Sequence, residues 1–136
     1  MSEIIIFAFL GHLIGDYLLQ SKAMALNKFE KGRYGALLCT LHVFLYTLAV
    51  CAMVAMIHPL SAWFAIVVFI PHWLIDRYSF ASWWLKLIKG RTFDAVFPDI
   101  MNQKEVFGAA FAAIVYTVTD NTFHALCLVA TIYWLL

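Results

Sequence analysis

Three histidine–aspartate pairs are prominent in a sequence that has few ionisable residues. In each pair the two residues are four positions apart, which places them on one face of a helix. The pairs are His12 with Asp16, His72 with Asp76 and, in reverse order, Asp120 with His124. Imidazole and carboxylate groups in this pattern are suited to hold a divalent metal such as zinc or manganese. Chains of the same groups also form proton or ion pathways, and both types of chemistry remain open from the spacing alone.

The pairs lie in a strongly apolar chain. Of its 136 residues, 65% are hydrophobic and only 12% are charged, which excludes an ordinary soluble domain and indicates a membrane protein. An ionisable group inside hydrocarbon costs roughly 2.5–3.5 kcal/mol on insertion scales, so such groups are rare unless they are used. Membrane lipids are therefore the expected partners, and no nucleic-acid partner is expected.

Residues 1–136 are expected to form one integral membrane domain of the all-α class, a bundle of four transmembrane helices. Each predicted span is near the ~20 residues needed to cross about 30 Å of hydrocarbon. The spans are placed at about residues 3–20, 34–57, 62–80 and 116–136. Residues 77–91 continue the third span as an amphipathic, interfacial segment that contains Trp83, Trp84, Lys86 and Lys89.

The basic residues predict the orientation of the chain. All nine Lys and Arg residues lie within residues 22–33 and 77–104. The positive-inside rule places both segments in the cytoplasm, so both termini are expected on the outer face. The predicted location is the bacterial inner (cytoplasmic) membrane, with several spans and the N-terminus outside.

The histidines of the first three spans share one predicted depth. His12, His42 and His72 each lie eight residues from the cytoplasmic end of a span, or about 12 Å deep. Counted in the same way, Asp16 and Asp76 lie about 6 Å deep. Three helices thus bring imidazole groups to one level, which predicts a single polar cluster in the cytoplasmic half of the membrane. The alternative is that each pair only satisfies itself or an interhelical hydrogen bond.

The last part of the chain is too long for one upright span. Residues 105–136 would extend about 48 Å as a helix. If the final span begins near Tyr116, His124 reaches the depth of the other histidines and Asp120 that of the other carboxylates. Residues 105–115 are then expected to form a separate short helix or re-entrant piece, continuous with or bent from that span.

The first span also carries a helix-packing pattern and is followed by polar residues. Gly11 and Gly15 form a Gly-x-x-x-Gly pair, which lets another helix approach closely. Gln20, Lys28 and Arg33 follow at the predicted inner rim, where they would bind the anionic head group of a substrate. The alternative role for the two basic residues is to set topology while touching anionic lipid.

The order of these residues resembles one protein family. It reads His12-x-x-x-Asp16-x-x-x-Gln20, then Lys28, His42, His72-x-x-x-Asp76 and Asp120-Asn121-x-x-His124. This order is similar to that of the small bacterial and phage membrane proteins grouped as domain of unknown function 3307, over nearly the whole chain. Asn121 stands where the family pattern has Gln, and Ala23 or Met24 where it has Trp. The resemblance implies no particular reaction. A more distant analogy links the His/Asp-rich spans to membrane-bound metal-dependent hydrolases.

Three functions fit these observations. The leading hypothesis is a metal-dependent hydrolase that acts on a lipid-like or phosphorylated substrate, with His12, Asp16, His72 and Asp76 as catalytic residues. The candidate metal ligands are His12, Asp16, His42, His72, Asp76, Asp120 and His124. The second hypothesis is a channel or transporter that uses these residues as an ion or proton pathway. It needs an oligomer, since four short spans leave little room for a pore, and a homo-oligomer remains open. The third is a phage membrane factor that acts on host membranes.

Overall fold

A computed structural model describes residues 1–89 and 103–136, with side chains through Ile88 and from Ala110 onward. The described residues form helices and connecting loops without any strand, which confirms the all-α class. η1 is a π-helical segment, and the other elements are α-helices. In chain order the elements are α1 (Ser2–Leu13), η1 (Ile14–Leu18), α2 (Lys22–Asn27), α3 (Arg33–Ala55), α4 (Ala62–Arg77), α5 (Phe80–Lys89) and α6 (Gln103–Leu135).

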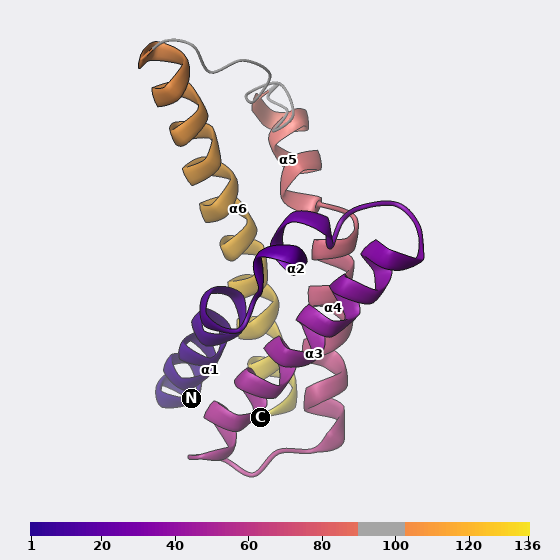
Figure 1. The fold of residues 1–136 in the computed structure, drawn as a ribbon. Helices are drawn as coiled ribbons and strands as arrows, with labels where there is room; N and C mark the ends of the chain where they lie inside the picture. Colours follow the sequence, from indigo (N-terminus) through magenta and orange to yellow (C-terminus); the bar gives the residue numbers. More distant parts are fainter. Residues whose placement is uncertain (90–102) are drawn as a thin grey trace.

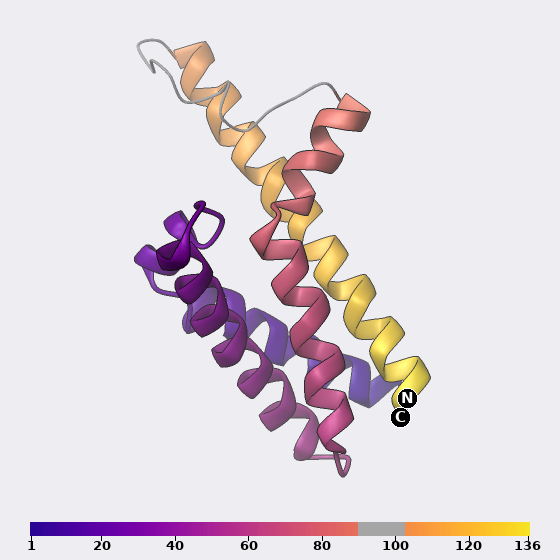
Figure 2. The same ribbon diagram turned by 90° about the vertical axis from the view of Figure 1, so that its right-hand side faces the viewer.

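Four of these helices surround a common interior. α1 packs against α3 and α6, and α4 packs against the same two helices. The two termini lie at one end of the bundle, where α3 also turns into α4, while α2 and α5 lie toward the other end (Figures 1 and 2). The chain thus builds a helical bundle with two distinguishable ends.

The interior changes from apolar to polar along the bundle. The apolar core lies near the termini and is formed by Ile4, Ala8, Tyr46, Val50, Val54, Phe64, Val68, Leu128 and Ile132. Four histidines are buried farther from the termini than this core. Large apolar side chains such as Phe44 and Leu48 are exposed on the outside of the bundle. An apolar exterior around buried ionisable groups is the arrangement expected in lipid.

Two of the described helices are long and apolar enough to cross a membrane. They are α3 and the part of α6 from Ala110 to Leu135. α4 also qualifies when it is counted together with α5, from which it is bent by 56°. α1 has 12 residues and is followed by the five residues of η1, so a uniform helix over residues 3–20 is not formed. Membrane association rests on these long apolar helices.

α1 approaches α3 closely at its two glycines. A Cβ atom built on Gly11 would lie 2.6 Å from the Cα atom of Val50, and one built on Gly15 would lie 2.8 Å from the Cα atom of Tyr46. Both distances are too short for any side chain, so only glycine permits this separation of the helices. The close approach predicted from the Gly-x-x-x-Gly pair is confirmed.

A sharp bend separates α4 from the amphipathic helix α5. Two residues, Tyr78 and Ser79, connect the helices, and Ser79 has a positive φ of 47°. α5 buries Ala81 and Leu85 while Trp83 is exposed. The amphipathic segment expected after the third span is therefore present through Lys89, and its remaining residues lie outside the described ranges.

α6 is one helix of 33 residues, which corrects the expectation for the end of the chain. Residues 105–115 are continuous with the rest of α6, which is one of the two connections expected, but they form neither a separate helix nor a re-entrant piece. Polar side chains in this part of α6 bond to the helix's own carbonyl groups. Thr119 and Thr122 donate hydrogen bonds to the carbonyl groups of Val115 and Val118, each at 2.7 Å. The start of α6 projects beyond α3 and α4, at the same end of the molecule as α5 (Figures 1 and 2).

Candidate functional site

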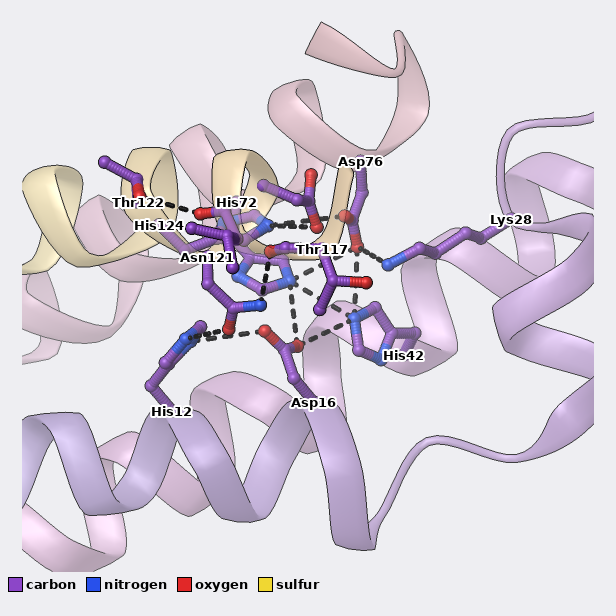
Figure 3. Close-up of polar contacts among 12 residues, drawn as sticks. His12, Asp16, Lys28, His42, His72, Asp76, Thr117, Asn121, Thr122 and His124 are labelled. Carbon is purple, nitrogen blue, oxygen red and sulfur yellow. Dashed lines mark hydrogen bonds and ion pairs between the residues drawn. The ribbon is translucent and has the colours of Figure 1, made fainter. Parts of the chain in front are cut away.

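All seven residues predicted as metal ligands lie in one group inside the bundle (Figure 3). They come from α1, η1, α3, α4 and α6, and five of them are buried while Asp16 and Asp120 are partly exposed. We call this group the His/Asp cluster, comprising His12, Asp16, His42, His72, Asp76, Asp120 and His124. The last pair belongs to it because the Nε2 atom of His124 lies 3.4 Å from Oδ1 of Asp76.

Two imidazole rings and two carboxylates meet at the centre of the cluster. The Nε2 atoms of His42 and His72 lie 3.2 Å apart. Both face Oδ2 of Asp76, at 3.0 and 3.2 Å, and Oδ1 of Asp16, at 3.3 and 3.6 Å. Each nitrogen carries at most one proton in a neutral ring, so these contacts cannot all be hydrogen bonds at the same time.

His12 lies beside this centre and contacts it through Asp16. Its Nδ1 atom is 3.2 Å from Oδ2 of Asp16, and its Nε2 atom is 2.7 Å from Oδ1 of Asn121. The amide nitrogen of Asn121 in turn donates hydrogen bonds to the hydroxyl group of Tyr17 and the carbonyl group of Thr117. The ring of His12 thus lies between Asp16 and Asn121 and contributes to the orientation of the Asp16 carboxylate.

A π-helical turn presents Asp16 to the cluster. In η1 the amide group of Leu19 donates to the carbonyl group of Ile14, five residues back. The wider turn changes the direction of the side chains that follow, and such segments are frequent at functional sites. Gly15 within the turn rests against Tyr46, which holds η1 on α3. The four-residue spacing predicted that His12 and Asp16 share a face but did not predict the π-helix.

The segment after η1 folds back over the cluster. The guanidinium group of Arg77 donates to the carbonyl groups of Glu30, at 2.6 Å, and Lys28, at 3.5 Å, which ties this segment to α4. Gln20, with its amide oriented so that both of its atoms have partners, accepts from Nδ1 of His42 at 3.3 Å and from Nζ of Lys28 at 3.1 Å. Two of the three predicted rim residues therefore touch the cluster.

Lys28 places an ammonium group inside the cluster. Its Nζ atom lies 2.8 Å from Oδ2 of Asp76, and both side chains are largely buried. Burial alone lowers the pKa of Lys28, but the negative charges of Asp76, Asp120 and Asp16 outweigh it and raise the pKa above its ordinary value. The group therefore stays charged at neutral pH, and its contribution to stability would be lost only in strongly alkaline solution.

Arg33, the third predicted rim residue, and His58, the fifth histidine of the chain, lie outside the cluster. Arg33 is the first residue of α3 and is exposed, away from the cavity described below. His58 lies at the turn between α3 and α4, where its ring contacts the carbonyl group of Pro59 at 2.8 Å. His58 is therefore a suitable control for the clustered histidines.

Tyr46 and Asn121 contact the cluster, although neither was predicted as a site residue. The ring of Tyr46 is buried, and its centroid lies 3.6 Å from that of His72. Tyr46 follows His42 by four residues on the same face of α3, which is the signal that points to it. Asn121 belongs to the sequence motif Asp120-Asn121-x-x-His124, but its contact with His12 depends on the packing of α6 against α1.

A cavity of about 540 Å³ lies directly against the cluster. Its volume is in the range of about 300–1,000 Å³ that is typical of small-molecule sites. Its lining includes the charged or amide side chains of Asp16, Gln20, Lys28 and Asp120, and the large side chains of Tyr17, Leu26, Phe29 and Tyr116. A ligand with both polar and apolar parts would match this lining.

The donor atoms of the cluster fit a metal ion. Two groups of three ligands have donor atoms within 4.8 Å of one another: Asp16, His42 and His72, and His72, Asp76 and His124. Tetrahedral bonds of about 2.0–2.1 Å would separate the donors by about 3.3 Å, close to the distances at the centre of the cluster. His72 belongs to both groups, whereas His12 and Asp120 belong to neither.

The unsatisfied hydrogen-bonding atoms and the net charge of the cluster also fit a bound metal ion. Oδ1 of Asp16, Oδ1 of Asp76 and Nε2 of His124 are buried, and none makes a well-formed hydrogen bond within the part of the chain that the structure describes. Such atoms require an explanation, for which a bound ion is one candidate. The cluster contains three carboxylates, and the ammonium group of Lys28 pairs with one of them, which leaves two negative charges when the imidazoles are neutral. One divalent cation would balance them.

Comparison with known proteins identifies the family. The family model described as "Protein of unknown function (DUF3307)" matches residues 4–136, which include every residue of the cluster and of the cavity lining. No curated protein and no solved structure matches the chain. The chain therefore belongs to the DUF3307 family.

Proposed function

We propose that this protein is a metal-dependent hydrolase within the membrane that acts on a lipid-like or phosphorylated substrate. The observation that carries the proposal is the convergence of the His42 and His72 nitrogens with the carboxylates of Asp16 and Asp76 beside a ligand-sized cavity. A cluster that served only for helix packing would need neither unsatisfied donor atoms nor a cavity next to them.

In the proposed arrangement four helical segments span the bacterial inner membrane: α1 with η1, α3, α4 and α6. The connections rich in Lys and Arg lie in the cytoplasm, and both termini lie outside. Support comes from the shared end of the bundle at which the two termini and the turn between α3 and α4 are found (Figures 1 and 2). The cavity then opens at the level of the inner-leaflet head groups.

A reporter fused after Leu136 is expected to be active only on the outer face of the membrane. A reporter inserted between Lys28 and Arg33 is expected to be active only in the cytoplasm, because the basic residues are retained there. At each of the two positions, the activity of an alkaline phosphatase fusion and that of a fluorescent-protein fusion would be compared to determine on which side of the membrane the position lies. Cytoplasmic activity after Leu136 would contradict the four-span arrangement.

The central residues are suited to hold zinc or manganese. His42 and His72 would bind the ion together with Asp16 or Asp76, since each carboxylate lies near both rings. A divalent ion in such a site acts as a Lewis acid and lowers the pKa of water toward about 7. His12 and Asn121 keep Asp16 oriented toward this position.

The remaining residues have roles in binding and proton transfer. Asp120 lines the cavity, and its contact with Nε2 of His124 is long, at 3.5 Å, so its carboxylate is positioned to accept a proton from water. The water oxygen then bonds to the phosphorus or acyl carbon of the substrate. The bond to the leaving oxygen breaks, and that oxygen takes up the proton from Asp120. Tyr17, Leu26 and Phe29 provide the apolar wall for a lipid chain.

Elemental analysis of the protein, purified in detergent without chelators, tests this function. About one zinc or manganese ion per chain is expected, as one divalent cation balances the cluster. The metal-loaded protein should hydrolyse a short-chain phospholipid or a phosphorylated lipid, lose this activity with chelator and regain it with the metal. A metal-free protein that passes protons when reconstituted in liposomes would favour the channel hypothesis instead.

A further inference from the structure

We propose that the Lys28 ammonium group and a divalent metal ion compete for the Asp76 carboxylate, and that the displaced ammonium group becomes the anion-binding group of the cavity. The inference rests on the proposed function, because it assumes that the cluster takes up a metal. It adds the chemical class of the ligand, which is a phosphate group, and a link between metal loading and substrate binding.

Three nitrogen atoms surround a single oxygen of Asp76. Lys28 Nζ lies 2.8 Å from Oδ2, and the Nε2 atoms of His42 and His72 lie 3.0 and 3.2 Å from the same atom. An ion held by the two rings and this oxygen would therefore lie beside the ammonium group. Like charges at such short range in a largely buried site repel strongly. The oxygen can serve the ammonium group or the ion, but not both.

The cavity offers the ammonium group a second position. Lys28 is among the residues that line it, together with Gln20 and Asp120. The backbone of this segment is held on α4 by Arg77, so the change requires rotation of the Lys28 side chain only. Once released from Asp76, the ammonium group faces the space where a substrate would lie.

A free ammonium group in the cavity favours an anionic ligand. Lysine binds phosphate as a point charge, and the Gln20 amide that contacts Lys28 supplies a further polar group. The metal-free site offers no such cation, because Asp76 neutralises Lys28 there. A bound metal ion is therefore expected to strengthen the binding of phosphate. By linkage, phosphate must then strengthen the binding of the metal ion by the same factor.

Manganese titration of the purified protein tests the competition. Lys28→Met is expected to bind Mn²⁺ roughly tenfold more tightly than the wild type, because the competing cation is gone. Lys28→Gln removes the same charge, keeps a hydrogen-bond donor and provides a second test if the methionine variant folds poorly. Lys22→Met, at the exposed start of α2, is the matched control and should not change the affinity.

The same titrations with inorganic phosphate, and separately with short-chain phosphatidate, test the coupling. In the wild type at least one of the two should tighten Mn²⁺ binding roughly tenfold, and in Lys28→Met this gain should disappear. A gain with phosphatidate alone identifies a lipid head group, and equal gains identify a site for phosphate itself. Unchanged or weaker Mn²⁺ binding by both Lys28 variants would overturn the inference while the proposed function stands. Absence of Mn²⁺ and Zn²⁺ from the wild type would instead contradict the proposed function.

Discussion

Replacement of His72 by alanine is expected to remove the proposed metal binding and the proposed hydrolase activity together. His72 is the one residue shared by both groups of candidate ligands, so neither group remains complete without it. Its Nε2 atom also lies 3.2 Å from the matching atom of His42, which would lose its neighbouring ligand. We expect metal affinity to fall by roughly a hundredfold or more, since even outer-shell changes cost about 10–100-fold.

A graded set of variants separates a catalytic cluster from a structural one. His12→Ala should weaken metal binding less than His72→Ala, because His12 acts through Asp16 and lies outside both groups. His58→Ala, at the turn between α3 and α4, is the control and should bind metal like the wild type. Metal content per chain and thermal unfolding would be measured for each variant. Equal metal content in His72→Ala and His58→Ala would show that the cluster is not the metal site.

Stability alone does not distinguish these possibilities. Removing His72 leaves the carboxylates of Asp16 and Asp76 with fewer partners, at a cost of about 1–3 kcal/mol for each buried group left unsatisfied. A lower unfolding temperature of His72→Ala is thus expected whether the cluster binds metal or only holds helices together. The decisive readout is the metal content of the fraction that remains folded.

Much of the cluster could be predicted because helix geometry relates sequence spacing to spatial position. A spacing of four residues places His72 and Asp76 on one face, and their side chains are 3.2 Å apart. Equal depth in successive spans placed His42 and His72 at one level, and their nitrogens lie 3.2 Å apart. These relations require only that the helices form and cross the membrane, which a strongly apolar sequence makes favourable.

The parts that could not be predicted depend on tertiary packing. The π-helical turn that presents Asp16 has no clear sequence signature, and it depends on the fit of Gly15 against Tyr46. The contact between Lys28 and Asp76, which are far apart in the sequence, depends on Arg77, which holds the segment that contains Lys28 on α4. α6 stays continuous, and its threonine side chains bond to the helix's own carbonyl groups. The spacing of residues contains none of this information.

Substitution of Gly15 by leucine is expected to weaken metal binding strongly although every ligand remains in the chain. A single Cβ atom at this position would lie 2.8 Å from both Cα and a ring carbon of Tyr46, so a larger side chain must push η1 away from α3. Asp16 is the next residue and would move away from His42 and His72. Displacement of a reactive group by about 1 Å can cost about a hundredfold in activity.

The same reasoning applies to Gly11, where a Cβ atom would lie 2.6 Å from the Cα atom of Val50. Gly11→Leu and Gly15→Leu should both lower the unfolding temperature, because overpacking typically costs about 1–3 kcal/mol.

Gly15→Leu should have the larger effect on metal binding, since Gly15 adjoins Asp16 directly. Ala52→Leu adds similar bulk on the exposed face of α3 and is the matched control. If Gly15→Leu fails to insert into the membrane, Gly15→Ala makes a milder test, because its methyl group already meets Tyr46. Normal metal affinity in both Gly15 variants would show that Asp16 does not need this helix contact, and Asp76 would then be the carboxylate that holds the ion.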